Sequence, residues 1–307
     1  MKKIIQIIMF IVLASCTKQS TTYPQTSDMT VLTSLKATEL LTQALTEGTE
    51  IKIELIVPET YSINSHARYF KKHSQELNTV ATKATACITI RSVWDNDDLY
   101  PYSRRSNVRI VEIDSSVPID RTQAGVKLLK SPTTNKISPY IWRSPANLTK
   151  MADFIAQDLC TLYADLAPQI NTNLKELKKD IFKLRTEYEA RLIDFDAVET
   201  ISLTSDFNYL ISEFGIDVLD SFLKQEIDWD QNDYAALARS ISDNNAKIVI
   251  CKRMPQKQLY EVIVTNSAQP VVLTTLINAK DTQQTPKKRL LNLYSINLDA
   301  ICNGLKN

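Results

Sequence analysis

The sequence predicts an α/β protein in which two parallel-sheet lobes are joined by one long rigid helix. Two observations on the 307-residue chain lead to this prediction. Short apolar segments alternate with amphipathic ones over residues 31–167 and again over 197–307, as in parallel sheets wrapped by helices. Between these lobes, residues 168–196 form one long amphipathic pattern of helix-forming residues.

The elements of the first lobe follow from hydrophobic spacing and from the residues that interrupt it. Residues 51–57 alternate and then run apolar, as strands do, and Pro58 ends the run. Farther along, Phe70 and Leu77 fall on one side of a helix. In order, this lobe is expected to contain a strand and a helix over 28–48, a strand over 51–57, a helix over 66–83, strands over 86–90 and 108–113, and a helix over 145–164.

The connecting helix places Leu177, Ile181 and Leu184 on one stripe, and its charges of both signs are typical of a solvated face. In the second lobe the alternation of strands and helices resumes, and Gly215 ends a short helix. The expected strands are 199–204, 216–219, 247–251 and 270–274, and the expected helices are 207–214, 232–244 and 290–305.

The N-terminus has the features of a secretory signal peptide over residues 1–15. Lys2 and Lys3 precede an apolar run that is too short to span a bilayer, and small residues stand just before Cys16. A cysteine directly after the cleavage site carries lipid in lipoproteins, and acyl chains contribute roughly 0.8 kcal/mol per buried methylene. We therefore expect an exported protein, lipid-anchored at Cys16 to a bacterial membrane in the periplasm or at the cell surface, with residues 16–30 as a flexible tether.

Composition excludes several classes of function. The chain has 36 basic and 35 acidic residues, a balance that argues against a nucleic-acid partner. With four glycines and two histidines, it lacks a Gly-rich phosphate loop, a nucleophile elbow and a metal cluster, so no enzyme is expected. The other cysteines are far apart, which excludes a CxxC motif; their pairing stays open, although buried free thiols are the simpler interpretation. They are Cys87, Cys160, Cys251 and Cys302.

Three segments resemble those of a known family. Residues 138–145, Ser-Pro-Tyr-Ile-Trp-Arg-Ser-Pro, are similar to the Asn-Pro-His-Val-Trp-Leu-Asp-Pro of the metal-binding lipoproteins of zinc and manganese ABC importers. The segment 204–209 and the tail 293–305 are also similar to parts of that family. The resemblance implies a helical-backbone solute-binding protein with zinc or manganese as transported ligand, an ABC permease as partner, and no resident cofactor.

The resemblance also assigns four metal-ligand positions, and this chain has a different residue at each. Zinc and manganese are bound by imidazole, thiolate or carboxylate groups, whereas the residues here offer neutral oxygens. The family's metal site is therefore expected to be altered or lost. The four positions, which the fold places in the cleft at the carboxyl ends of the strands, are Asn64, Tyr140, Thr204 and Thr274.

Two functions remain open. In the first, the protein is an importer subunit with an altered site, in which His66 meets Asp206 after a shift of its loop. In the second, it is an envelope lipoprotein that binds another ligand or a protein on the same scaffold and no longer binds metal. Trp142 is expected to pack in the core, and the hydroxyl group of Tyr140 could bind a ligand or fill the vacated site.

Overall fold

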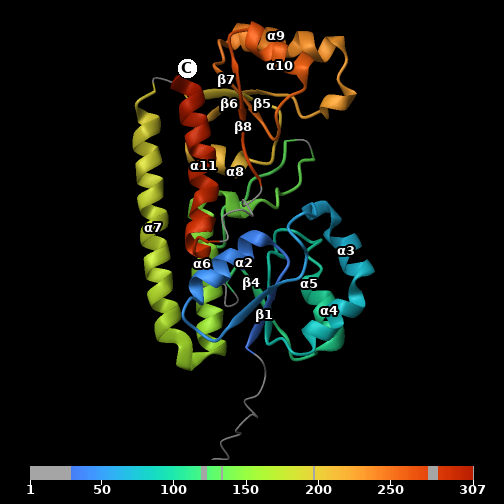
Figure 1. The fold of residues 1–307 in the computed structure, drawn as a ribbon, viewed down its shortest axis with the longest axis vertical. Coiled ribbons are helices and arrows are strands. Elements are labelled where there is room, and N and C mark those ends of the chain that lie inside the picture. Colours follow the sequence, from blue (N-terminus) through green and yellow to red (C-terminus); the bar gives the residue numbers. More distant parts are fainter. Residues whose placement is uncertain (1–28, 119–122, 133, 196–197, 276–282, 307) are drawn as a thin grey trace, which may run out of the picture.

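The computed structural model describes residues 29–118, 123–132, 134–195, 198–275 and 283–306. The expected signal peptide, Cys16 and the tether up to residue 28 lie outside the described residues. Two α/β lobes follow one another along the longest axis, and helix α7 (Ala167–Ile193) runs beside both (Figure 1). Each lobe contains a four-stranded sheet in which all neighbouring strands are parallel. The predicted fold class is confirmed.

The first lobe is built on a sheet with the strand order β2-β1-β3-β4. Its central strands β1 and β3 are buried along their whole length, because helices cover both faces of the sheet. The elements of this lobe are β1 (Thr30–Thr33), α2 (Lys36–Leu45), β2 (Lys52–Leu55), α3 (His66–Lys72), α4 (Ser74–Ala81), β3 (Ala86–Thr89), α5 (Leu99–Ser106), β4 (Val111–Asp114) and α6 (Pro145–Leu162).

The second lobe repeats this plan with the strand order β6-β5-β7-β8. Its edge strand β6 is exposed throughout, whereas β7 is fully buried. Helix α9 begins at a capping box in which Asp230 and Asp233 each accept a backbone hydrogen bond from the other residue. The elements are β5 (Glu199–Ser202), α8 (Asn208–Glu213), β6 (Asp217–Ser221), α9 (Gln231–Asn244), β7 (Ile248–Cys251), α10 (Lys257–Thr265), β8 (Gln269–Val272) and α11 (Pro286–Lys306).

The structure differs from the expected helices in three places. The single helix expected over 66–83 is divided at His73, whose φ of −107° and ψ of 26° leave the helical region. Helices α5 and α10 were not expected. Pro101 in the first turns of α5 and the β-branched Val262 and Val264 of α10 weaken the helical signal. Both helices form because they bury Leu99 and Ile263 against the sheets.

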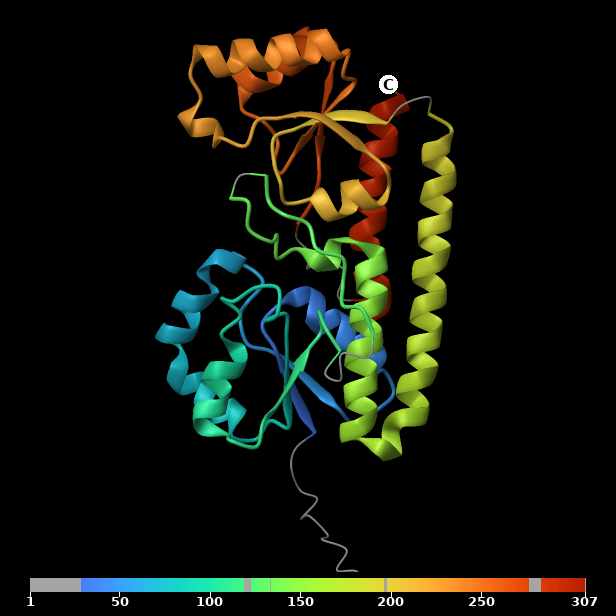
Figure 2. The ribbon, with the colours of Figure 1, turned by 180° about the vertical axis from the view of Figure 1, so that it is seen from behind.

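Two long helices connect the lobes. Helix α7 buries Leu177, Ile181 and Leu184, the stripe that the sequence indicated. Helix α11 contacts α7, α2 of the first lobe and β8 of the second lobe, so it packs against both lobes (Figure 2). The largest hydrophobic cluster accordingly extends through both lobes, and smaller clusters cover the outer face of each sheet.

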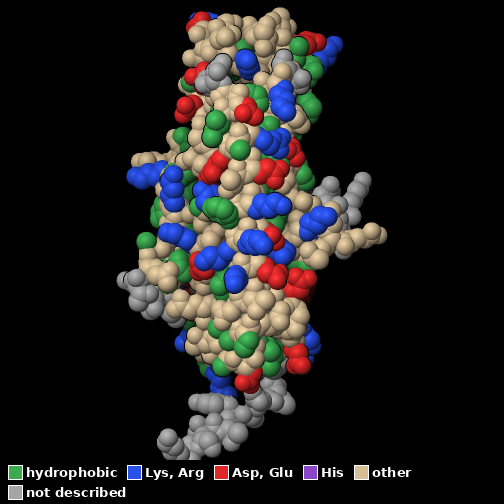
Figure 3. Space-filling model, turned by 90° about the vertical axis from the view of Figure 1, so that its left-hand side faces the viewer, with side chains coloured by type: hydrophobic (Ala, Val, Ile, Leu, Met, Phe, Trp, Pro, Cys, Tyr) green, Lys and Arg blue, Asp and Glu red, His purple; other side chains and the backbone are tan. Residues whose placement is uncertain are grey.

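The outer face of α7 is polar. Lys and Arg side chains lie among Asp and Glu side chains over this side of the molecule (Figure 3). Some of them form ion pairs between elements, such as Lys178 with Asp153 at 2.7 Å and Lys287 with Asp180 at 3.0 Å. Such a face is solvated, as expected from the sequence. Throughout the described residues, each helix is too short or too polar to span a bilayer.

The four cysteines within the described residues are free thiols. Cys87, Cys251 and Cys302 are buried, and Cys160 is partly buried. Burial raises the pKa of the Cys251 thiol to about 12 and also raises the pKa of the Cys87 thiol. These thiols are therefore protonated at neutral pH and serve as packing groups.

Candidate functional site

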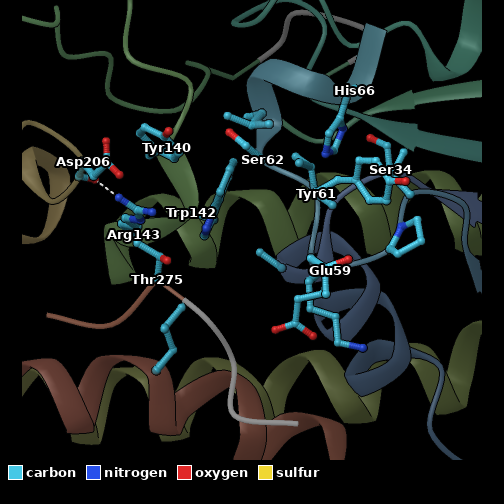
Figure 4. A pocket seen from close by; sticks show the side chains of 18 of the residues that line it. Ser34, Glu59, Tyr61, Ser62, His66, Tyr140, Trp142, Arg143, Asp206 and Thr275 are labelled. Atoms are coloured by element: carbon cyan, nitrogen blue, oxygen red, sulfur yellow. Dashed lines mark hydrogen bonds between the residues drawn. The ribbon is translucent and has the colours of Figure 1, made fainter. Parts of the chain in front are cut away.

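A cavity of about 270 Å³ lies between the two lobes. Its walls include residues that directly follow strands of both sheets: Ser34 follows β1, Asp206 lies beyond β5, and Lys252 follows β7. Figure 4 shows the cavity with side chains from the two lobes facing it. A second hollow of about 700 Å³ adjoins it and shares Asp206, Lys252 and Thr275 with it. This is the edge at which open α/β sheets bind their ligands.

The structure divides the expected site residues between these hollows. Tyr140, His66 and Asp206 line the first cavity. Asn64 and Thr204 line the adjoining hollow, together with Asp206. The structure thus brings these residues to two neighbouring hollows, which the sequence did not distinguish.

Thr274 lies against α11. Its backbone N–H donates to Asn297 Oδ1 at 2.8 Å, and Asn297 Nδ2 donates to the Thr274 carbonyl oxygen at 3.1 Å. Because Asn297 is buried in α11, this pair of hydrogen bonds fixes the end of β8 to the helix. The next residue, Thr275, is the one that faces the cavity.

His66 is buried at the first-lobe end of the cavity, where 3% of its surface is exposed. Its ring meets the ring of Trp94 edge-on at 5.5 Å and lies 6.4 Å from the ring of Phe70. Burial lowers the pKa of His66 to about 4, so the imidazole is neutral at pH 7. Its Nδ1 has no hydrogen-bond partner among the described residues.

Asp206 at the second-lobe end is surrounded by positive charge. Its carboxylate forms an ion pair with Lys252 Nζ, and its carbonyl oxygen accepts a hydrogen bond from Arg143 Nη1. The Arg143 guanidinium lies 4.1 Å from the Tyr140 ring centroid and 4.6 Å from that of Phe207. Burial lowers the pKa of Arg143 to about 10, so it remains charged at neutral pH. A cation approaching Asp206 would have to displace the Lys252 ammonium group.

His66 and Asp206 line one cavity but lie at opposite sides of it. Figure 4 places Tyr140 and Trp142 between them. In the part of the chain that the structure describes, no three His, Cys, Asp or Glu side chains are grouped so that they could hold a metal ion. The pairing of His66 with Asp206 stays a prediction, and it would require the cleft to rearrange.

Glu213 holds the lobes together beside this cavity. It lies at the end of α8, accepts hydrogen bonds from the Ser144 hydroxyl group and from the backbone N–H of Ala146 at 2.9 Å, and pairs with Arg185 Nε at 2.8 Å. Ser144 is also the N-cap of α6 and accepts a hydrogen bond from the backbone N–H of Asn147 at 3.0 Å. These contacts fix the position of the segment that carries Tyr140 and Arg143.

Besides Lys36 at the start of α2, three charged residues that line the cavity were not singled out in the sequence. Glu59 stands directly after the Val-Pro step that follows β2, Arg143 lies within the segment 138–145, and Lys252 directly follows β7. The rule that ligands bind at the carboxyl ends of strands could have drawn attention to Glu59 and Lys252. Their partners and burial could not be read from the sequence.

A two-lobed α/β body with a polar cleft at the carboxyl ends of its strands is the architecture of a solute-binding protein. The sequence model of the periplasmic component A of zinc-uptake complexes matches residues 31–304, so the chain belongs to that family. The resemblance drawn from the sequence is confirmed. Proteins of this family are exported, work with ABC permeases, and in general are not enzymes.

Solved structures share this fold at low sequence identity. An FpvC mutant from Pseudomonas aeruginosa gives a TM-score of 0.72 at 15% identity, covering 90% of this chain and 99% of that one. The metal-dependent lipoprotein YcdH from Bacillus subtilis gives 0.68 at 16% identity, with coverages of 89% and 97%. A structure of ZnuA gives 0.66 at 17% identity, with coverages of 90% and 98%. No curated protein sequence matches the chain significantly.

Proposed function

We propose that this protein is the lipid-anchored solute-binding subunit of an ABC importer whose cleft has lost the metal site of its family. Family membership supports the importer role and favours it over that of an envelope protein unrelated to transport. The main support for the loss of the metal site is the ion pair between Asp206 and Lys252. It places an ammonium group on the carboxylate that a metal ion in this cleft would need.

The residues at the assigned ligand positions support the same conclusion. Asn64, Tyr140, Thr204 and Thr274 provide amide and hydroxyl oxygens, which carry no charge to offset a divalent cation. His66 is the one imidazole among the described residues that line the cavity, and aromatic rings pack around it. A tetrahedral or octahedral set of anionic and imidazole ligands therefore cannot be assembled from the side chains as they stand.

Metal analysis of the purified full chain tests this function. After growth in metal-replete medium, we expect less than stoichiometric zinc, manganese or iron and a thermal midpoint that these metals leave unchanged. A site filled at 100 times its Kd would add about 2.7 kcal/mol of stability, which such a measurement detects. One metal ion per chain, lost on His66→Ala, would instead establish a site at His66 and refute the proposed loss.

The lipid anchor is tested separately at Cys16. The mature chain should begin at this residue and carry a diacylglycerol on its thiol, which intact-mass spectrometry measures. A Cys16→Ser variant should leave the membrane fraction while retaining its fold. A variant that stays membrane-bound through another segment would contradict the anchor.

A further inference from the structure

The first-lobe end of the cavity carries one negative charge that no neighbouring side chain offsets. Glu59 lines the cavity, and its buried Oε1 has no hydrogen-bond partner among the described residues. The base on the same wall, Lys36, forms an ion pair with Glu39 at 2.5 Å. His66 beside them is neutral and has an unpartnered Nδ1. Within the described part of the chain, this end of the cavity therefore carries a carboxylate without an ion-pair partner, and beside it an unpartnered imidazole nitrogen that is itself buried.

The second-lobe end of the cavity carries an excess of positive charge. Arg143 and Lys252 both line the cavity there, and among the described lining residues the acid that faces them is Asp206. Two positive charges thus meet one negative charge. Arg143 is held in place by its hydrogen bond to the Asp206 carbonyl oxygen and by the Tyr140 and Phe207 rings. Figure 4 shows Glu59 on one side of the cavity and Arg143 and Asp206 on the other.

The cavity has room for an organic molecule between these ends. A water molecule takes up about 30 Å³, and a protein cavity of about 150 Å³ holds benzene. The volume of about 270 Å³ found here therefore exceeds what a bare metal ion would fill. The ring of Trp142 lies between the charged ends and that of Tyr140 lies beside Arg143 (Figure 4), and both offer apolar faces for a hydrocarbon portion.

We propose that the cavity binds a small zwitterionic solute of the ω-amino-acid class, whose ammonium group, at Glu59, and carboxylate, at Lys252 and Arg143, stand at opposite ends of its hydrocarbon portion. This inference rests on the proposed role as a solute-binding subunit and names the class of solute. A simple carboxylic acid would leave Glu59 without a partner, and a simple amine would meet the positive excess at the other end. A zwitterion satisfies both ends with charge-assisted hydrogen bonds.

Calorimetric titration of the purified full chain tests this assignment. The probes are straight-chain ω-amino acids of increasing length, followed by the decarboxylated and the des-amino analogue of the tightest binder. We expect saturable binding of at least one amino acid and a loss of about tenfold or more in affinity for either analogue. Glu59→Gln and Lys252→Met should each weaken the amino acid by a similar factor. The matched controls, Glu54→Gln and Lys257→Met, change exposed residues outside the cavity and should bind as the wild type does.

Each of the following results would overturn the assignment of the solute. The assignment is refuted if no amino acid saturates the protein at concentrations up to about 10 mM, which is well above the Kd expected of a solute-binding subunit. Unchanged affinity in Glu59→Gln, or equal binding of the des-amino analogue, refutes the placement of the ammonium group. Stoichiometric binding of zinc or manganese without any amino acid refutes both this assignment and the proposed loss of the metal site. If neither metal nor amino acid binds, the assignment fails and the metal-free importer subunit stands.

Discussion

Replacing Glu213 by alanine tests how the two lobes are held together. The Glu213 side chain is 7% exposed and lies at the N-terminus of α6, where a helix favours negative charge. The variant removes the ion pair to Arg185 and leaves the Ser144 hydroxyl and the Ala146 N–H group without their acceptor. Arg185, which is 33% exposed, retains only its longer pair with Glu189 at 3.4 Å.

The expected cost of Glu213→Ala is large because the carboxylate that it removes is buried, as is the Ser144 hydroxyl group that loses its acceptor. Breaking a buried ion pair by removing one partner costs about 3–5 kcal/mol. For a chain of this size that corresponds to a fall in the thermal midpoint of about 6–10 °C, at roughly 2 °C per kcal/mol. Glu189→Ala removes the exposed partner of the same Arg185, so it should cost about 0.5 kcal/mol or less.

Differential scanning calorimetry of the three proteins measures this difference. Glu213→Ala should melt well below the wild type, and Glu189→Ala should melt within about 1 °C of it. Equal midpoints for the two variants would refute the reasoning, because the lobes would then not depend on the buried carboxylate.

Three further substitutions have outcomes that follow from the geometry. The contribution of His66 to stability should fall by about 3 kcal/mol as the pH falls from about 6.5 to about 4, because the unfolded chain binds a proton at His66 before the folded chain does. His66→Phe should lack that part of the pH dependence of its urea midpoint, and an unchanged slope would contradict the neutral imidazole. Tyr294→Phe removes the buried hydroxyl group that donates to the Trp142 carbonyl oxygen and should lower stability by about 1–3 kcal/mol; an unaltered melt would show that this bond contributes nothing. Gly304→Ala would bring a Cβ to within 2.6 Å of Val271 Cγ2, so it should destabilise the chain by about 1–3 kcal/mol, and a higher melting temperature would contradict this packing.

The sequence predicted the elements whose signals are local. Buried strands such as 247–251 read as apolar runs, and Pro145 marked the start of α6. The break at His73 could not be predicted, because Phe70 and Leu77 keep a helical spacing across it and both pack on the sheet. Helices α5 and α10 depend on tertiary burial that outweighs their weak propensities.

The site was predictable only in its location. Parallel strands end at one edge of each sheet, so residues that follow them were expected to line a cleft. The ion pair of Lys252 with Asp206 joins residues from two different strand ends, and the sequence contains no pattern that specifies such pairing. The burial that makes His66 neutral and holds Arg143 between two rings is likewise a property of the assembled lobes.

Isothermal titration of zinc and manganese into the purified full chain tests the loss of the metal site most directly. With Lys252 on the Asp206 carboxylate, we expect no saturable binding by the wild type at Kd values tighter than about 1 mM. Binding of one ion per chain with a micromolar or tighter Kd, abolished by His66→Ala, would contradict the account.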